Sequence, residues 1–212
     1  MIDARPLIEQ FLAKDDLEAL ALAVATPYKA CADFMGSNVV TSSFPIGIEQ
    51  KPHLLRAFID HSLMRMADSR AGFNHEMKWN VAHNCMHIRV FKGRCAMTAH
   101  FMGRKNFRTS ARHAENREIL AMRNGDLFAY EGSEMDDFAN NGYVQILHGG
   151  NASPEFLMLV IPTHDQSRIS AGMELKIPAV DAAAAEVIRE EMILKLKTQD
   201  AGAAQDGNQA AG

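Results

Sequence analysis

The side chains best suited to metal chemistry lie between positions 83 and 100, and they are His83, Cys85, His87 and His100. Apolar and polar residues alternate along this stretch, which predicts two β-strands with one face in the core. Imidazole and thiolate side chains are ligands that Zn, Fe and Ni accept. The stretch therefore predicts a divalent metal site, with the upstream carboxylate of Glu76 as its candidate general base.

The two strands are predicted to meet at a two-residue turn formed by Lys92 and Gly93. In this register Cys85 faces His100, and the Cβ atoms of facing residues lie roughly 4.5–5.5 Å apart. The alternative is the ordinary polar face of a half-buried antiparallel sheet, on which Arg89 would oppose a bound cation. A register slip of one residue would also scatter the ligands. The other face is apolar and is predicted to belong to the core; it holds Met86, Ile88, Val90, Cys95, Met97, Ala99 and Phe101.

A second group of residues matches a pattern found in metal-dependent nucleases, with Asp165 followed by Glu174 and Lys176. In such sites two carboxylates bind Mg²⁺ and the lysine orients the attacking water. A strand predicted over residues 173–177 would put Glu174 and Lys176 on one face. The alternative is a solvent-facing ion pair on an edge strand, because a Glu-x-Lys triplet is common in chains of this length.

A basic segment between two predicted hairpins forms the third candidate site. Guanidinium groups match the geometry of phosphate, and an aromatic ring can stack on a base. The segment therefore predicts contact with nucleic acid or another anion, whereas the alternative is a solvated connecting loop whose charge Glu115 and Glu118 dilute. Its candidate contact residues are Arg104, Lys105, Phe107, Arg108, Arg112 and Arg117.

The familiar catalytic templates are missing from the sequence. It contains no HExxH zinc motif, no GxGxxG or GxxxxGK[ST] phosphate loop and no GxSxG nucleophile elbow. This favours an interaction or regulatory protein that contacts another protein or a nucleic acid. The alternative is a metal-dependent hydrolase or nuclease that uses the residues named above with Zn, Fe, Ni or Mg.

The N-terminal third is predicted to be helical. Pro6 fits the first turn of a helix, and Asp15 or Asp16 can cap a second one. Thr26 and Pro27 are predicted to restart the chain as a third helix, which ends at Gly36. Residues 37–50 are predicted to be a loop or a short strand. The clearest helix is predicted to open at Pro52, with an apolar stripe from Leu55 to Met66 and with Arg56 and Asp60 away from that stripe.

After residue 83 the hydrophobic period changes from 3.6 to 2, which predicts a series of hairpins. The first covers residues 84–102, and the second covers residues 118–131 around Asn124-Gly125, a typical type I′ turn sequence. A third pairs residues 143–148 with 156–161. Asp181 is predicted to cap a last helix over residues 181–197, and residues 199–212 have almost nothing to bury and are predicted to be a disordered tail.

These elements predict one α+β domain over residues 1–198, helical in 1–72 and mainly β in 83–178. N-terminal helices are expected to pack on an antiparallel β-meander of five to seven strands. The net charge of −4 lacks the basic bias of a dedicated duplex-DNA binder. Three cysteines without a CxxC pair, no signal-peptide pattern and no long apolar run favour a cytoplasmic protein that does not enter a membrane. The methionine-rich faces close on themselves or on a second copy, so a homodimer is one expectation.

Overall fold

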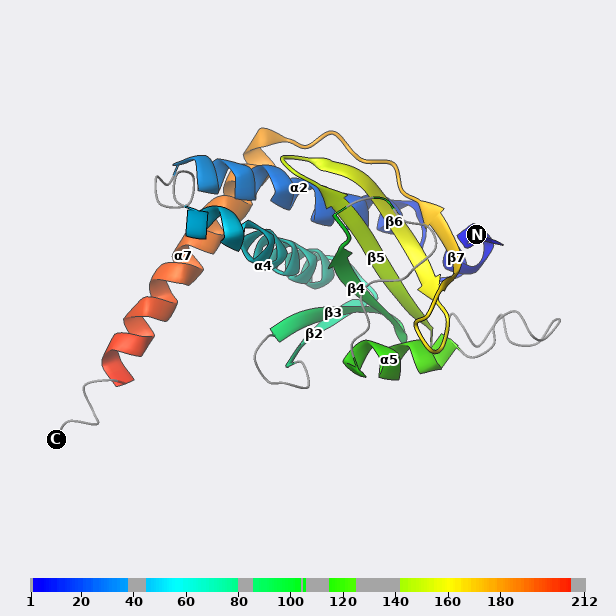
Figure 1. Ribbon diagram of the computed structural model, residues 1–212. Helices are drawn as coiled ribbons and strands as arrows, with labels where there is room; N and C mark the ends of the chain where they lie inside the picture. Colours follow the sequence, from blue (N-terminus) through cyan, green and yellow to red (C-terminus); the bar gives the residue numbers. More distant parts are fainter. Residues whose placement is uncertain are drawn as a thin grey trace.

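The computed structural model describes residues 2–37, 45–79, 86–103, 105, 115–124 and 142–206. Two long helices lie on one face of a seven-stranded sheet, and a third long helix packs across those two (Figure 1). These helices are α2 (Lys14–Ser37), α4 (Pro45–Ser69) and α7 (Ala182–Asp206). The short α1 (Arg5–Ile8) precedes them, and α5 (Glu115–Ala121) continues into a 3-10 turn at Met122–Asn124. The α+β class predicted from the sequence is therefore confirmed.

The strands are ordered β1-β7-β6-β5-β4-β3-β2 across the sheet. All neighbouring pairs are antiparallel except β1 with β7 and β4 with β5, which are parallel. The sheet is thus mixed, and the prediction of a purely antiparallel meander is wrong. The strands are β1 (Ile2–Asp3), β2 (Phe73–Trp79), β3 (Met86–Lys92), β4 (Cys95–Phe101), β5 (Tyr143–Gly150), β6 (Pro154–Pro162) and β7 (Ile169–Glu174).

The parallel step between β4 and β5 arises because residues 115–121 form α5 and not the first strand of a hairpin. Leu120 and Ala121 are both buried while Ile119 and Met122 are exposed, a pattern that fits one helical face and not strand alternation. Asn124 is the last residue of the 3-10 turn. Its side chain bonds the backbone N–H and C=O of Tyr143 and the C=O of Pro162. Residues 125–141 lie outside the described part of the chain.

Two prolines predicted to open helices lie inside them. Pro27 sits within α2, and Pro52 sits within α4, which begins seven residues earlier at Pro45. A proline removes one backbone hydrogen bond from a helix interior. In α2 the surrounding turns are buried on the sheet through Val24, Tyr28 and Cys31, so tertiary packing outweighs that local cost.

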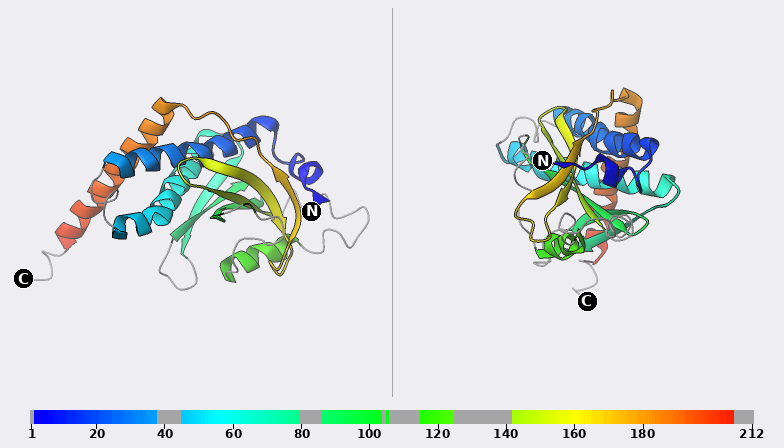
Figure 2. Two further views of the ribbon diagram at one scale, coloured as in Figure 1. Left: turned by 45° about the horizontal axis from the view of Figure 1, so that its top comes forward. Right: turned by 90° about the vertical axis from the view of Figure 1, so that its right-hand side faces the viewer.

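The main core lies between these helices and the inner face of the sheet (Figure 2). Ile88, Val90, Cys95 and Met97 contribute to it, which confirms the predicted core face in the middle of the first hairpin. Met86 and Phe101, at the strand ends, are 38% and 45% exposed and do not belong to it.

The C-terminal elements differ from the prediction in their bounds. β7 ends at Glu174, so the predicted strand over 173–177 is displaced toward the C-terminus. Asp181 does cap α7, since its Oδ1 accepts the N–H of Ala183 at 3.0 Å. The helix continues to Asp206, past the predicted end at residue 197. No helix in the described part of the chain is both long and apolar enough to cross a membrane.

Candidate anion-binding site at an opening in the sheet

The first hairpin separates toward its open end. β3 and β4 pair only from Lys92↔Cys95 to Val90↔Met97, although β3 begins at Met86 and β4 continues to Phe101. β4 stays with β5 over that second half, as far as Phe101↔His148. β3 therefore leaves the sheet plane of β4 before residue 90, and the space between them is called the β3–β4 opening below.

The turn of this hairpin is Gly93-Arg94 and not Lys92-Gly93, because Lys92 pairs with Cys95. Gly93 has a φ of +60°, which suits the first central position of such a turn. The predicted register is thus wrong by two residues. A shift of two residues keeps every side chain on its predicted face, so His87, Thr98 and His100 still lie on the face turned away from the long helices.

Side chains of α4 take the place of a strand partner along the free edge of β3. A guanidinium N–H of Arg56 donates to the C=O of Met86, and the carboxyl of Asp60 accepts the N–H of Ile88. In a strand, the N–H and C=O groups of every second residue point toward the same neighbouring strand. The C=O of Met86 and the N–H of Ile88 therefore point to the side of β4, and they would bond β4 if the two strands stayed paired. Arg56 Nε and Asp60 Oδ2 lie 3.7 Å apart. This pair satisfies the edge of β3 and keeps the opening from closing.

A hydrogen-bonded network centred on His100 lines the opening from the side of β4. Arg117 of α5 donates to Nδ1 of His100 at 2.9 Å. Because a guanidinium can only donate, Nδ1 is the acceptor and the proton of the neutral ring is on Nε2. That Nε2–H lies 2.6 Å from Oγ1 of Thr98, which is 2.7 Å from the hydroxyl of Tyr143. The network fixes both the tautomer and the orientation of His100.

The histidines of the opening are held in their neutral forms. Burial, followed by the charges of Arg89, Arg56 and Arg117, lowers the pKa of His87 to about 4. Burial lowers the pKa of His100 well below its ordinary value, and Arg117 is the next cause. Arg56 also adds to the lowering at both rings. The opening is therefore partly shielded from water, and its electrostatic potential is positive.

Two carboxylates lie beside these arginines. Glu76 pairs with Arg89 at 3.2 Å. Asp60 pairs with Arg56, but burial raises the pKa of Asp60 to about 7, so its negative charge is only partial at neutral pH.

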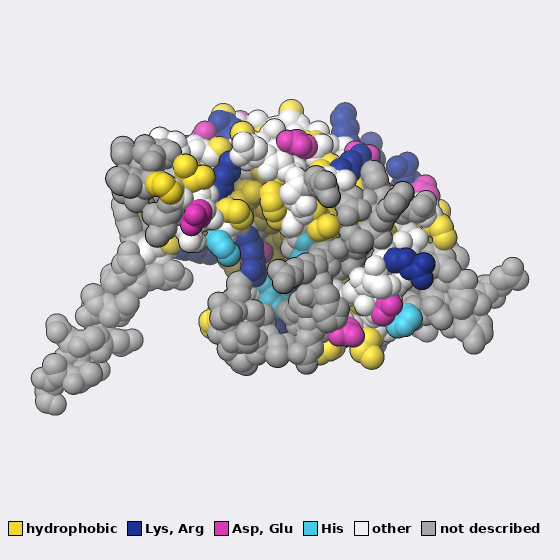
Figure 3. All heavy atoms as spheres, viewed as in Figure 1, with side chains coloured by type: hydrophobic (Ala, Val, Ile, Leu, Met, Phe, Trp, Pro, Cys, Tyr) yellow, Lys and Arg dark blue, Asp and Glu magenta, His cyan; other side chains and the backbone are white. Residues whose placement is uncertain are grey.

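The sheet face toward α4 is apolar beside the opening. Met77, Trp79, Met86 and Phe101 are 42%, 50%, 38% and 45% exposed, although the register puts all four on the face that carries the core. In the space-filling view the molecule is hollowed below α4, and histidine, basic and apolar side chains lie together in that hollow (Figure 3). The surroundings of the opening therefore combine cationic and apolar groups.

Of the four predicted metal ligands, His87 and His100 share one face, whereas His83 and Cys85 lie outside the described residues. Within the described ranges no group of three His, Cys, Asp or Glu side chains could hold a metal ion. Both ring nitrogens of His100 already have hydrogen-bond partners, and one partner is the cation Arg117. The metal site stays a prediction. The predicted base, Glu76, lies on the same outer face and is bound to Arg89.

The structure does not bring the predicted nuclease residues together. Asp165 lies in the turn before β7, where hydrogen bonds from Thr163 and Ser167 lower the pKa of its carboxyl. Glu174 is at the far end of β7, so the length of that strand, about 16 Å at about 3.3 Å per residue, separates it from the turn. Lys176 is exposed in the chain that follows the strand. The nuclease site stays a prediction.

The predicted basic segment is described only in part. Arg104, Phe107, Arg108 and Arg112 lie outside the described residues. Nζ of Lys105 contacts both carboxylate oxygens of Glu174 at 2.8 Å. Arg117 donates to His100 on β4, whereas Lys105 contacts Glu174 on β7, so the two basic residues bind different strands.

Sequence reasoning missed three residues of the opening: Arg56, Asp60 and Tyr143. The i,i+4 spacing of Arg56 and Asp60 was the only signal that linked two of them. Nothing in the sequence indicates that the Arg56–Asp60 pair of α4 bonds the edge of β3 in place of β4. That arrangement depends on the residue at which the β3–β4 pairing stops.

Comparisons of the chain with models of protein families, with curated proteins and with solved structures find no match.

Proposed function

We propose that this protein is a non-enzymatic binding module for a small organic anion with an apolar body, and that the anion enters the β3–β4 opening. One observation carries the proposal: Arg56, Arg117 and the two neutral imidazoles converge where the sheet stops pairing. This agrees with the expectation of an anionic partner and narrows it from a nucleic acid to a small molecule.

The electrostatics of the opening support an anion. Guanidinium groups bind carboxylate and phosphate through paired N–H donors, and burial strengthens such bonds. Burial lowers the pKa of Arg117, which reports that its charge is poorly hydrated. Arg56 also lowers that pKa, so the two guanidinium groups lie close enough to repel each other. An anion between them relieves this repulsion.

The apolar surroundings support a ligand with a hydrocarbon or aromatic part. Trp79 and Phe101 present large rings beside the opening, and an exposed indole or phenyl ring gains free energy when an apolar group covers it. Inorganic phosphate would satisfy the charges alone. A carboxylate attached to a ring satisfies both the charges and the apolar surface.

The test is calorimetric titration with four probes, namely benzoate, benzamide, acetate and inorganic phosphate. Benzoate and benzamide differ in charge, whereas benzoate and acetate differ in the apolar body. We expect benzoate to bind at least about tenfold more tightly than benzamide, since one charged hydrogen bond is worth about 1.5–3 kcal/mol. We also expect it to bind more tightly than acetate, because acetate has no ring to cover the apolar surface. We expect phosphate to bind more weakly than benzoate.

Arg117→Gln is the matched variant, because glutamine keeps a donor for Nδ1 of His100 and removes the charge. It is expected to weaken benzoate binding about tenfold or more. Arg168→Gln, on the exposed turn before β7, is the control and leaves binding unchanged. Equal affinity for benzoate and benzamide, or wild-type affinity in Arg117→Gln, contradicts the proposal.

A metal-dependent hydrolase is the second candidate, favoured by the two neutral imidazoles on one face. It predicts near-stoichiometric Zn, Fe or Ni in protein purified without a chelator, and loss of that metal in His87→Ala. Under the anion-binding proposal, benzoate binding is the same before and after treatment with EDTA.

A further inference from the structure

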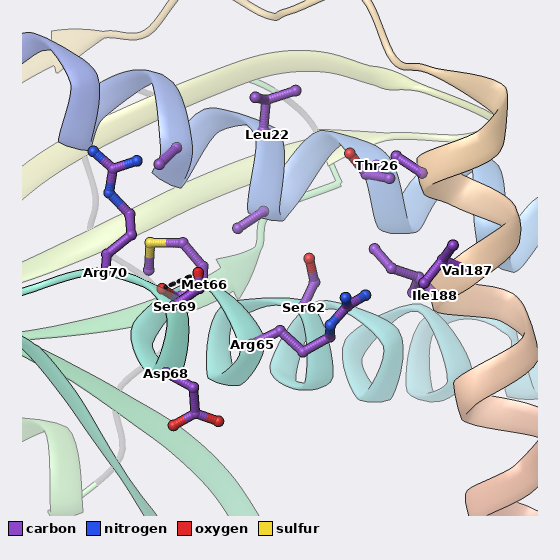
Figure 4. Close-up of a pocket in the computed structure, with 13 residues that line it drawn as sticks. Leu22, Thr26, Ser62, Arg65, Met66, Asp68, Ser69, Arg70, Val187 and Ile188 are labelled. Carbon is purple, nitrogen blue, oxygen red and sulfur yellow. Dashed lines mark hydrogen bonds between the residues drawn. The ribbon is translucent and has the colours of Figure 1, made fainter.

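An open groove lies on the outer side of the helical layer, away from the β3–β4 opening. It has a volume of about 770 Å³ and runs between α2 and α4, with the first turns of α7 closing one end (Figure 4). Small residues line much of it, including Ala19, Ala23 and Ala184. Leu22 and Val187 border it and are each 42% exposed. Small residues on the floor of a groove let another helix approach closely.

The helix that closes this groove extends beyond the body of the protein. α7 packs on α2 and α4 through Ala185, Ile188 and Met192, and its later turns project past the helical layer (Figure 1). Leu194 on this projecting part is 62% exposed. An isolated helical segment of a few turns is marginal in water, so packing against another surface would stabilise it.

One face of α7 carries a stripe that starts in the groove. Ala184, Val187, Glu191 and Leu194 are spaced at i, i+3, i+7 and i+10, so they share a helix face. Ala184 and Val187 line the groove, and Oε2 of Glu191 lies 3.4 Å from Nε of Arg65, which lines it too. The stripe therefore starts in the groove at Ala184 and Val187, passes Arg65 at Glu191, and continues beyond the groove at Leu194.

We infer that a second copy of this chain covers the groove, with the two α7 helices antiparallel about a twofold axis. In this arrangement Val187 of each copy lies against Leu194 of the other, because the axis passes between residues 190 and 191. Each projecting helix end then lies over the groove of the other copy. The interface is isologous, so it closes as a dimer and does not propagate.

At the centre of this arrangement Glu190 of one copy lies beside Glu191 of the other. Oε2 of Glu191 is held within its own chain by Nε2 of His61 at 2.7 Å and by Nε of Arg65 at 3.4 Å. Arg65 is 44% exposed in the groove, so its guanidinium is accessible to Glu190 of the entering helix. The basic residue that lines the groove thus meets an acidic residue of the entering helix.

The first test is analytical ultracentrifugation of the full chain over roughly a hundredfold range of concentration, since dimerisation follows mass action. The wild-type protein is expected to be a dimer that dissociates on dilution. Leu194→Arg is expected to raise the dissociation constant about tenfold or more. Leu196→Arg is the matched control, because residue 196 is two positions on and lies on the opposite side of the helix. Circular dichroism checks that both variants are folded.

The second test is disulfide cross-linking. A mixture of the Val187→Cys and Leu194→Cys variants is expected to form a covalent dimer, whereas either variant alone does not, because like positions are about 10 Å apart along the antiparallel helices. A monomer at every concentration overturns the inference and leaves the groove to a different partner. A dimer that Leu194→Arg does not weaken, or cross-linking of Val187→Cys with itself, overturns it as well.

Discussion

At the scale of single residues, His148 shows how burial sets a pH response. Its ring packs edge-on against Tyr28 and Phe101, and its Nδ1 lies 2.8 Å from the hydroxyl of Tyr28. Burial raises the pKa of Tyr28, so the phenol keeps its proton and can donate it. Burial lowers the pKa of His148 to about 4. The folded protein therefore requires a neutral imidazole at this position.

This requirement predicts a loss of stability in mild acid. Because the folded-state pKa is below the unfolded value of 6.5, the unfolded chain binds more protons, and stability falls as the pH drops from about 6.5 to about 4. The contribution of His148 is at most about 3 kcal/mol. His148→Asn keeps an acceptor for Tyr28 but cannot titrate, so it is expected to flatten this part of the profile. Urea unfolding across the pH range measures it, and an unchanged slope in the variant contradicts the assignment.

The sequence predicted which face each side chain of the first hairpin takes, because alternation depends only on strand parity. It did not predict which residues oppose one another, since that depends on whether the turn is at Lys92-Gly93 or at Gly93-Arg94. Trp79 shows a further limit. Its register position is on the face that carries the core, but it is 50% exposed because β2 extends beyond the cover of the helices.

At the scale of elements, the edge of β3 depends on Asp60. Asp60→Ala removes the acceptor of the Ile88 N–H and is expected to cost about 1–3 kcal/mol. Amide hydrogen exchange at Ile88 should accelerate in this variant. If exchange at Ile88 is unchanged, Asp60 does not hold that edge.

Asp60→Asn separates the hydrogen bond from the charge, because asparagine keeps an acceptor. The folded-state pKa of about 7 is above the ordinary 3.8, so the stability contributed by the protonated acid is present below pH 3.8 and is lost as the pH rises through about 7. The asparagine variant is therefore expected to gain stability relative to wild type as the pH rises through 7.

The contact between β5 and β6 predicts a strong effect at Gly149. A Cβ there would lie 2.5 Å from Cε1 of Phe156, whose ring is 2% exposed and cannot move aside. Gly149→Ala is expected to cost about 1–3 kcal/mol in thermal or urea unfolding. Gly36→Ala is the control, since a Cβ at Gly36 meets nothing within 4 Å. A helical alanine there is neutral or slightly stabilising. Equal effects of the two substitutions would show that Phe156 does not limit the space.

Element types were predictable where the pattern was long, as in α4 and in the β5–β6 pair. They were not predictable where two local signals competed. Asn124-Gly125 favours a turn, but residues 115–121 are good helix formers, and Leu120 and Ala121 gain burial against Ala96 and Tyr143 only on the far face of the sheet. That gain is tertiary, and no local window contains it.

At the scale of the whole molecule, α5 is what separates the observed sheet from the predicted meander. A strand at 118–123 would have continued the antiparallel order, whereas a helix carries the chain across to a parallel partner. The same helix delivers Arg117 to His100. The crossover between β4 and β5 thus accounts for the misplaced element and for the position of Arg117, whereas Arg56 and Asp60 depend on where the β3–β4 pairing ends.

The pairing of β1 with β7 has a consequence for synthesis of the chain. Ile2 and Asp3 pair with Ala171 and Gly172, so β1, which is synthesised before the other six strands of the sheet, pairs with β7, which is synthesised after them. During translation the residues of β1 have no strand to pair with while the other strands assemble. The outer edge of β7 then stays unpaired until β1 docks on it. The pairing of β1 with β7 is therefore a late event in folding, and it joins the first and the last strand of the sheet.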